Sequence, residues 1–297
     1  IRRPPRSTPL YSSAASDVYK RQINNKGESK SYKFSIRSSP NESLNEISAN
    51  FYSEMKIYNY NLINLNYKHI AKSNILLPNK SIAFKINLKS NVKEVGYIKG
   101  AGDKIPESLK SIGISVTELD LSKLESYNLE KFPSIIMGIR AYNTNSLLKI
   151  KNNILWNYVK NGGNLIIQYN TSRRLKNNKI TPYKISISRD RVTNEKSIVK
   201  FLNPNHKILN YPNKISLNDF DNWVQERGLY FPNEWGNEFT SVLSMNDINE
   251  DEKKGSLLVA YYGKGTFIYT GLSFFRQLPN GIPGAYKLFV NLISHKR

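Results

Sequence analysis

Between residues 94 and 170, short apolar runs alternate with segments of helical periodicity, and this alternation constrains the fold more than any other feature of the sequence. Runs typical of buried strands occupy residues 94–100, 114–120, 135–139 and 164–170. One helix is predicted over 101–113, with Pro106 near its start and Gly113 at its end, and a second over 146–163. Strands that alternate with helices across short connections predict an α/β fold with a doubly wound, mostly parallel sheet.

The last part of the chain extends the same pattern. Residues 255–274 contain two apolar runs on either side of Gly263-Lys264-Gly265, which predicts a hairpin. Residues 284–296 then have the apolar spacing of a helix. We therefore assign residues 94–297 to one α/β domain.

The preceding residues, 23–93, have a different pattern. Residues 31–39, 47–70 and 81–90 are rich in β-favouring residues, often in alternation, and turn residues separate them. This pattern predicts a small β-sandwich, truncated at its start. Residues 1–22 are Pro-, Ser- and Arg-rich and resemble translated sequencing adapter, so we expect a non-native, disordered tail there and a true N-terminus further upstream.

Composition removes several function classes. The chain has 297 residues and no cysteine, which excludes disulfides, Cys-based zinc sites and Cys catalysis. A net charge of +21 is compatible with a nucleic-acid partner, but the basic residues are scattered, which is more typical of a solvated surface. The sequence has no apolar run of about 18 residues, so no membrane span is predicted.

Polar and charged side chains follow the predicted parallel strands, and ligands of open parallel sheets bind at the carboxyl ends of the strands. The residues expected at this rim are Asp103, Arg140, Asn143, Asn170 and Arg173. Arg140 and Arg173 are suited to clamp an anionic ligand. Alternatively, they pair with a glutamate from residues 218–239, which needs no ligand.

Residues 218–239 combine tryptophan, tyrosine and phenylalanine with acidic and basic side chains. Glu226, Arg227 and Trp235 of this segment are candidates for carbohydrate or protein contacts, because ring faces stack while polar groups form hydrogen bonds. The alternative is an insertion that packs its own aromatic rings onto the sheet.

Three other kinds of site receive less support from the residues. The glycines at 96, 100 and 102 match neither a dinucleotide fingerprint nor a P-loop. A stand-alone hydrolase would use Ser172 as nucleophile and His206 as base, although Ser172 lacks flanking glycines. No spacing of histidines or carboxylates typical of a metal site occurs, so neither a metal nor a cofactor is expected in this chain.

Several segments together resemble the C-terminal region of large bacterial PIG-L family (LmbE-like) deacetylases. The segments are "GYIKGAGDKIPESL", "GIRAYNTN", "VKNGGNLIIQYNTS", "SRDRVT", "WVQERGLYFPNEW" and "YTGLSFFRQLPNGIPGAYKLFVNLI". The resemblance implies a class I glutamine amidotransferase-like, flavodoxin-like domain. It places the nucleophile position of that fold at Gln168-Tyr169-Asn170, where the expected cysteine is absent.

The resemblance also implies a function. It suggests a non-catalytic accessory region, for docking or glycan binding, of a zinc-dependent N-acetyl-sugar deacetylase. The zinc ligands of that family belong to an N-terminal catalytic domain with a His-Pro-Asp-Asp motif, which is absent here. The expected partners are that missing domain and a glycan, and the family favours a periplasmic or secreted location.

Overall fold

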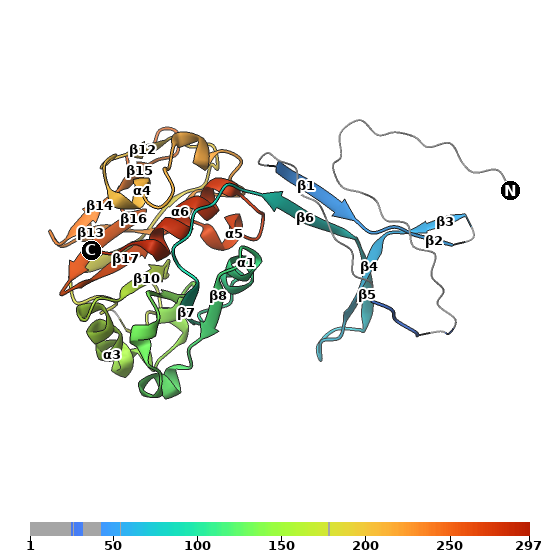
Figure 1. The fold of residues 1–297 in the computed structure, drawn as a ribbon, viewed down its shortest axis with the longest axis horizontal. Helices are drawn as coiled ribbons and strands as arrows, with labels where there is room; N and C mark the ends of the chain where they lie inside the picture. Colours follow the sequence, from blue (N-terminus) through green and yellow to red (C-terminus); the bar gives the residue numbers. More distant parts are fainter. Residues whose placement is uncertain (1–24, 26, 32–42, 54, 178) are drawn as a thin grey trace. The chain divides into compact units, whose positions relative to one another are not determined.

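The computed structural model describes residues 25, 27–31, 43–53, 55–177 and 179–297 (Figure 1). The chain divides into two units, residues 1–87 and 88–297. The predicted adapter-like tail at 1–22 and most of the predicted strand at 31–39 lie outside the described residues.

The described part of the first unit consists of three two-stranded antiparallel ladders. They pair β1 (Ser43–Ser48) with β6 (Lys80–Lys85), β2 (Phe51–Ser53) with β3 (Lys56–Tyr58), and β4 (Tyr60–Leu65) with β5 (Ser73–Pro78). Apolar side chains of β4 and β5 remain exposed, and Leu62 and Leu76 are 59% and 62% accessible. A sandwich needs two sheets that bury their facing side chains. Within the described residues the predicted β-sandwich is therefore not confirmed.

The second unit is built on a mixed sheet of seven strands. The strand order is β14 (Phe239–Ser241), β16 (Leu257–Tyr262), β17 (Gly265–Thr270), β10 (Asn164–Gln168), β9 (Ser134–Met137), β7 (Glu94–Ile98) and β8 (Ser115–Glu118). The last five of these strands are parallel, as predicted. The predicted hairpin is β16–β17, and β16 and β14 make one side of the sheet antiparallel.

Helices pack on both faces of this sheet. On one face, Leu165 and Ile167 of β10 belong to the same buried cluster as Leu155 and Val159 of α3 (Leu148–Lys160). On the other face, Asn164 Nδ2 donates a hydrogen bond to a carbonyl of α6 (Pro283–Ser294). α1 (Ile105–Ser111) completes the main helices. The α/β class is thus confirmed, with a mixed sheet instead of a purely parallel one.

The chain between β10 and β16 forms a layer of small elements that the sequence did not indicate. Its main component is a ribbon of β11 (Ile185–Val192) and β13 (Gly228–Trp235). The other small elements of the unit are η1 (Leu121–Ser126), η2 (Leu129–Lys131), α2 (Ala141–Thr144), β12 (Val199–Phe201), α4 (Lys207–Asn210), η3 (Leu217–Phe220), β15 (Leu243–Met245) and α5 (Phe274–Gln277).

Candidate functional site: a cationic pocket at the carboxyl edge

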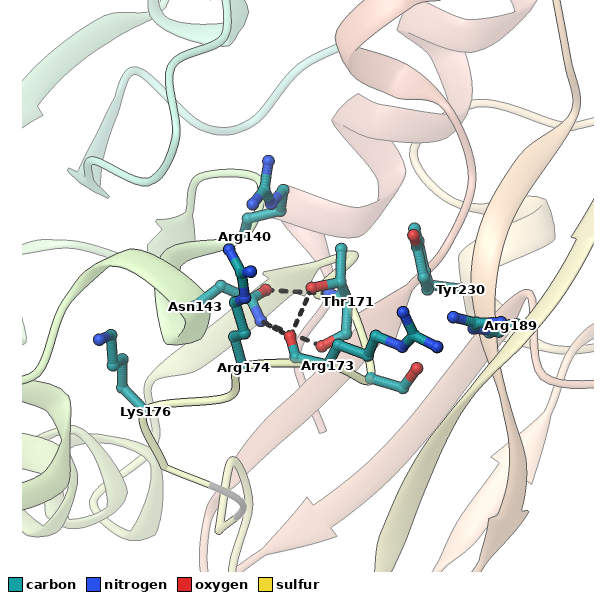
Figure 2. A pocket seen from close by; sticks show the side chains of 9 residues that line it. Arg140, Asn143, Thr171, Arg173, Arg174, Lys176, Arg189 and Tyr230 are labelled. Atoms are coloured by element: carbon teal, nitrogen blue, oxygen red, sulfur yellow. Dashed lines mark hydrogen bonds between the residues drawn. The ribbon is translucent and has the colours of Figure 1, made fainter.

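A cavity of about 430 Å³ opens beyond the carboxyl ends of β9 and β10 (Figure 2). Its lining comes from the turn after β9, the loop after β10 and the β11–β13 ribbon. The lining residues are Arg140, Asn143, Thr171, Ser172, Arg173, Arg174, Lys176, Arg189 and Tyr230. This edge of a parallel sheet is where α/β proteins generally bind ligands.

The charge of the pocket is its most distinctive property. Its lining contains five cationic side chains, those of Arg140, Arg173, Arg174, Lys176 and Arg189, and no carboxylate. In the part of the chain that the structure describes, none of the five side chains forms a salt bridge or a side-chain hydrogen bond. Positive charge that has no counter-charge in the protein attracts anions into the cavity.

Arg140 occupies a sharp turn between strand β9 and helix α2. Its backbone is left-handed, with φ 57° and ψ 26°, and its N–H donates to the carbonyl of Tyr169. In hydrolases with a nucleophile elbow, a strained strand-to-helix turn of this kind carries the nucleophile. Here it carries a guanidinium group, which cannot act as one.

The position inferred from the resemblance, Gln168-Tyr169-Asn170, is not such a turn. β10 ends at Gln168 and is followed by bends instead of a helix. The strand-to-helix geometry therefore belongs to Arg140, one strand away from the expected place. The sequence did not show which strand carries this turn, because Arg140 and Asn170 both lie within three residues of the end of an apolar strand.

Asn143 holds the loop that carries Arg173 and Arg174. Its Oδ1 accepts a hydrogen bond from the N–H of Thr171 at 2.9 Å. Its Nδ2 donates to the carbonyls of Thr171 and Arg173 at 3.0 and 3.1 Å. Because Asn143 is 7% exposed, these bonds are shielded from water and fix the loop, so Asn143 is a positioning residue.

Arg189 and Tyr230 reach the pocket through irregularities in the β11–β13 ribbon. Ile187 pairs with Pro232 and Asp190 with Phe231, so Ser188 and Arg189 bulge out of β11. The hydroxyl of Ser188 secures this bulge by donating to the carbonyl of Phe231 at 2.7 Å. On β13, Tyr230 is left out of the pairing. Bulges commonly re-aim side chains next to binding sites.

Left-handed backbone is concentrated around the cavity. Seven described non-glycine residues have positive φ, and three of them, Arg140, Arg174 and Tyr230, line the pocket. Such conformations are costly for large side chains, by about 1–3 kcal/mol each, and cluster at functional sites. Their grouping here is a second, independent indication of a binding site.

Two of the residues predicted at the rim have structural roles instead. Asp103 accepts hydrogen bonds from the N–H groups of Ile105 and Ile139, both at 3.0 Å, and so ties the start of α1 to the end of β9. Asn170 is fully buried, where its Oδ1 accepts from the N–H of Tyr142 and its Nδ2 donates to the carbonyl of Gln168. Of the predicted rim, Arg140, Asn143 and Arg173 line the pocket.

The alternative to an anionic ligand, a glutamate of residues 218–239 paired with Arg140 and Arg173, does not occur among the described ion pairs. Glu226 is buried and binds other arginines, Arg191 at 2.6 Å and Arg276 at 3.0 Å.

Two other predicted residues of that segment also lie outside the pocket lining. Arg227 is buried, with its guanidinium over the rings of Phe220 and Trp223, and desolvation lowers its pKa to about 10. Trp235 packs against the main core cluster. Most of the segment's aromatic rings are thus core.

The structure does not bring Ser172 and His206 together. Ser172 lines the pocket beyond the carboxyl end of β10. The His206 ring accepts the N–H of Ile208 and stacks on His295, which directly follows α6. The carboxy-terminal turn of α6 is bonded to Ser134 and Asn164, the first residues of β9 and β10. Serine and histidine therefore lie at opposite ends of the parallel strands.

No group of three or more histidines or carboxylates among the described residues is arranged to hold a metal ion. Among the helices that the structure describes, none has both the length and the apolar character needed to cross a bilayer.

The sheet and its two helical layers define an α/β protein with a cationic pocket at the carboxyl edge. No protein family and no curated protein matches the chain by sequence. Among solved structures, it is similar to a putative GMP synthase subunit from Thermoplasma acidophilum, with 10% identity over 69% of this chain and 94% of that one, and a TM-score of 0.42.

The chain is also similar to two further solved structures. PurLQS from Thermotoga maritima is 11% identical over 68% of this chain and 97% of that one, with a TM-score of 0.43. A β-galactosidase from Bacillus circulans sp. alkalophilus is 10% identical over 69% of this chain and 31% of that one, with a TM-score of 0.42. Likeness at this level does not assign a function, and these comparisons give no support to the PIG-L resemblance.

Proposed function

We propose that residues 88–297 form a non-catalytic module that binds an anionic ligand in the cationic pocket. The observation that carries this proposal is the set of five cationic side chains around one cavity, none of them neutralised by a described carboxylate. Four of the five are arginines, whose planar guanidinium groups bind oxyanions in bidentate fashion. Mutual repulsion among the five groups is relieved when an anion enters.

The lack of an assembled nucleophile supports the non-catalytic part of the proposal. Arg140 stands at the strained strand-to-helix turn, and the base candidate His206 belongs to the other end of the strands. The lining contains the hydroxyls of Thr171, Ser172 and Tyr230, and no histidine or carboxylate lines the pocket to act as their base. A hydroxyl without a base is a poor nucleophile at neutral pH.

In the wider protein, we propose the accessory role that the sequence resemblance implies. The module would bind an anionic glycan, or an acidic surface of a deacetylase domain, on behalf of a zinc-dependent parent enzyme. This assignment rests on the resemblance alone, and an intact gene that encodes a His-Pro-Asp-Asp motif upstream would support it.

Calorimetric titration of the full chain with inorganic sulfate and phosphate tests the binding proposal. We expect saturable binding that Arg173→Ala/Arg189→Ala weakens by about tenfold or more, because each lost guanidinium removes a charge-assisted hydrogen bond. The matched control, Lys110→Ala/Lys149→Ala, removes the same charge from exposed positions on α1 and α3 and is expected to leave binding unchanged. Equal losses of affinity in both double variants would show that net charge alone causes the effect, and would contradict the proposal that the anion binds in the pocket.

Ester hydrolysis by the same preparation tests the non-catalytic part. We expect no turnover of p-nitrophenyl acetate above the buffer rate. Turnover that Ser172→Ala abolishes and Lys149→Ala preserves would instead establish a hydrolase.

A further inference from the structure

We infer that the ligand of the cationic pocket is a phosphorylated sugar, whose phosphate monoester lies among the arginines and whose ring packs against Tyr230. This inference rests on the proposed function and specifies its ligand. It combines the charge of the pocket, its size and the aromatic ring in its lining.

The charge points to a ligand with more than one negative charge. A single carboxylate would compensate one of the five cations, whereas a phosphate monoester carries a charge of about −1.5 to −2 at neutral pH and three strong acceptor oxygens, so it compensates more of the charge and can bond to several guanidinium groups. Figure 2 shows the Arg173 side chain running toward Arg189 and Tyr230, so two guanidinium groups approach the same part of the cavity. We therefore assign the phosphate to these two arginines.

The size of the pocket points to more than an inorganic ion. A cavity of about 430 Å³ falls within the roughly 300–1,000 Å³ typical of small-molecule sites. One water molecule occupies about 30 Å³ of the liquid, so a lone phosphate would fill only a small part of the cavity. The remaining volume accommodates a sugar ring.

Tyr230 provides a surface for that ring. It is half-buried, stacks on Tyr169 with 10° between the ring planes, and lines the cavity. Aromatic faces pack against the C–H groups of sugars, and the Ser172 hydroxyl in the same lining can donate to or accept from ring hydroxyls.

The backbone of Tyr230 strengthens this assignment. Its φ of 53° is a conformation that glycine adopts freely and a bulky residue rarely does. The hydroxyl of Tyr269 holds it there by donating to the Tyr230 carbonyl at 3.1 Å. A strained tyrosine in a binding pocket is accounted for when its ring contacts the ligand.

A ligand series measured by calorimetry on the full chain tests the inference. The compounds are glucose 6-phosphate, glucose 1-phosphate, glucose and inorganic phosphate. We expect at least one sugar phosphate to bind about tenfold more tightly than inorganic phosphate, and glucose to bind more weakly than both. Tyr230→Leu is expected to weaken binding of the sugar phosphate by a larger factor than binding of inorganic phosphate, and so to remove the advantage of the sugar phosphate.

The outcomes separate this inference from the proposed function. If inorganic phosphate binds as tightly as both sugar phosphates, the anion module stands and the sugar inference is overturned. If nothing in the series binds, both fail. Dodecathymidylate serves as a nucleic-acid probe. If it binds more tightly than the sugar phosphates, and Tyr230→Leu does not change its affinity, the pocket belongs to a nucleic-acid surface and the inference is overturned. Should Tyr230→Leu not fold, the comparison of ligands on the unmodified chain still decides.

Discussion

The ring of Tyr230 stacks on the ring of Tyr169, with their centroids 6.0 Å apart. The two residues face different constraints, because Tyr169 is 7% exposed in an ordinary conformation whereas Tyr230 is half-buried and left-handed. The stack therefore joins a residue that supports the fold to a residue that the fold holds under strain. This difference predicts that truncating the two rings has unequal effects on stability.

Tyr169→Ala is expected to lower the free energy of unfolding by about 3 kcal/mol, as for other buried aromatic residues. Tyr230→Gly is expected to change it by less than about 1 kcal/mol, because relief of the left-handed strain offsets the lost stacking. Urea unfolding of both variants checks this. A larger loss for Tyr230→Gly than for Tyr169→Ala would show that the Tyr230 ring is primarily structural.

Glu226 provides a second prediction because its carboxylate is 4% exposed and binds both Arg191 and Arg276. Glu226→Ala removes the counter-charge of two arginines, and we expect a loss of about 2–3 kcal/mol, reduced from the fully buried case because both arginines retain contact with water. The control is Glu234→Ala. Glu234 pairs with Lys184 on the surface, where both side chains are more than half exposed, so we expect a change within about 0.5 kcal/mol. Similar losses in the two variants would contradict the distinction.

Asn170→Ala tests the structural role of a residue that the sequence placed at the rim. The substitution leaves the buried N–H of Tyr142 and the carbonyl of Gln168 without partners, and we expect a loss of about 2 kcal/mol by thermal or urea unfolding. Asn157→Ala, at an exposed position in the last turn of α3, is expected to be neutral or slightly stabilising because alanine is the better helix former. An unchanged stability of Asn170→Ala would make Asn170 a candidate ligand contact again.

His295 makes stability depend on pH. Burial, followed by the nearby His206 and Lys207, lowers the pKa of His295 from 6.5 to about 4. At pH values between these two pKa values, His295 is therefore protonated in the unfolded chain and neutral in the folded chain. The stability that the neutral His295 side chain contributes to the folded chain is fully present above about pH 6.5. It is lost as the pH falls toward about 4, by roughly 3 kcal/mol in total.

The difference between the unmodified chain and His295→Leu isolates this effect from the titration of carboxylates. We expect the free energy of unfolding of His295→Leu to fall less steeply between about pH 6.5 and about pH 4.5. His69→Gln, which changes an exposed histidine, is expected to keep the full slope. Equal slopes in all three proteins would contradict the lowered pKa.

The sequence revealed the central sheet because its signals are local. The run at 94–100 is strand β7 over Glu94–Ile98, and the run at 164–170 is β10 over Asn164–Gln168. Short apolar segments between turn residues are sufficient for such assignments. The rule that ligands gather at the carboxyl ends of parallel strands likewise predicted that Arg140 and Arg173 lie at one edge of the sheet, and both line the same cavity.

The parts that the sequence did not reveal depend on distant pairings. Arg189 and Tyr230 meet at the pocket only because β11 and β13 pair with three register shifts, and no local pattern specifies that register. The prediction that Asn170 and Asp103 belong to the ligand-binding rim had another cause. Asn170 and Asp103 follow strands as ligand-binding residues do, yet their side chains turn inward to satisfy backbone groups. Polarity alone cannot separate these two uses.

The bulges also make the pocket lining depend on the exact number of residues in β11 and β13. Because side chains alternate between the two faces of a strand, deleting one residue between Ile187 and Asp190 would turn Arg189 to the opposite face of the ribbon. A deletion beside Tyr230 would do the same on β13. In related proteins, the spacing of these two strands would therefore decide which ligands fit, even where every pocket residue is retained. Inserting or deleting a single residue in β11 or β13, with the loops left unchanged, is therefore a direct way to change the ligand specificity of the pocket.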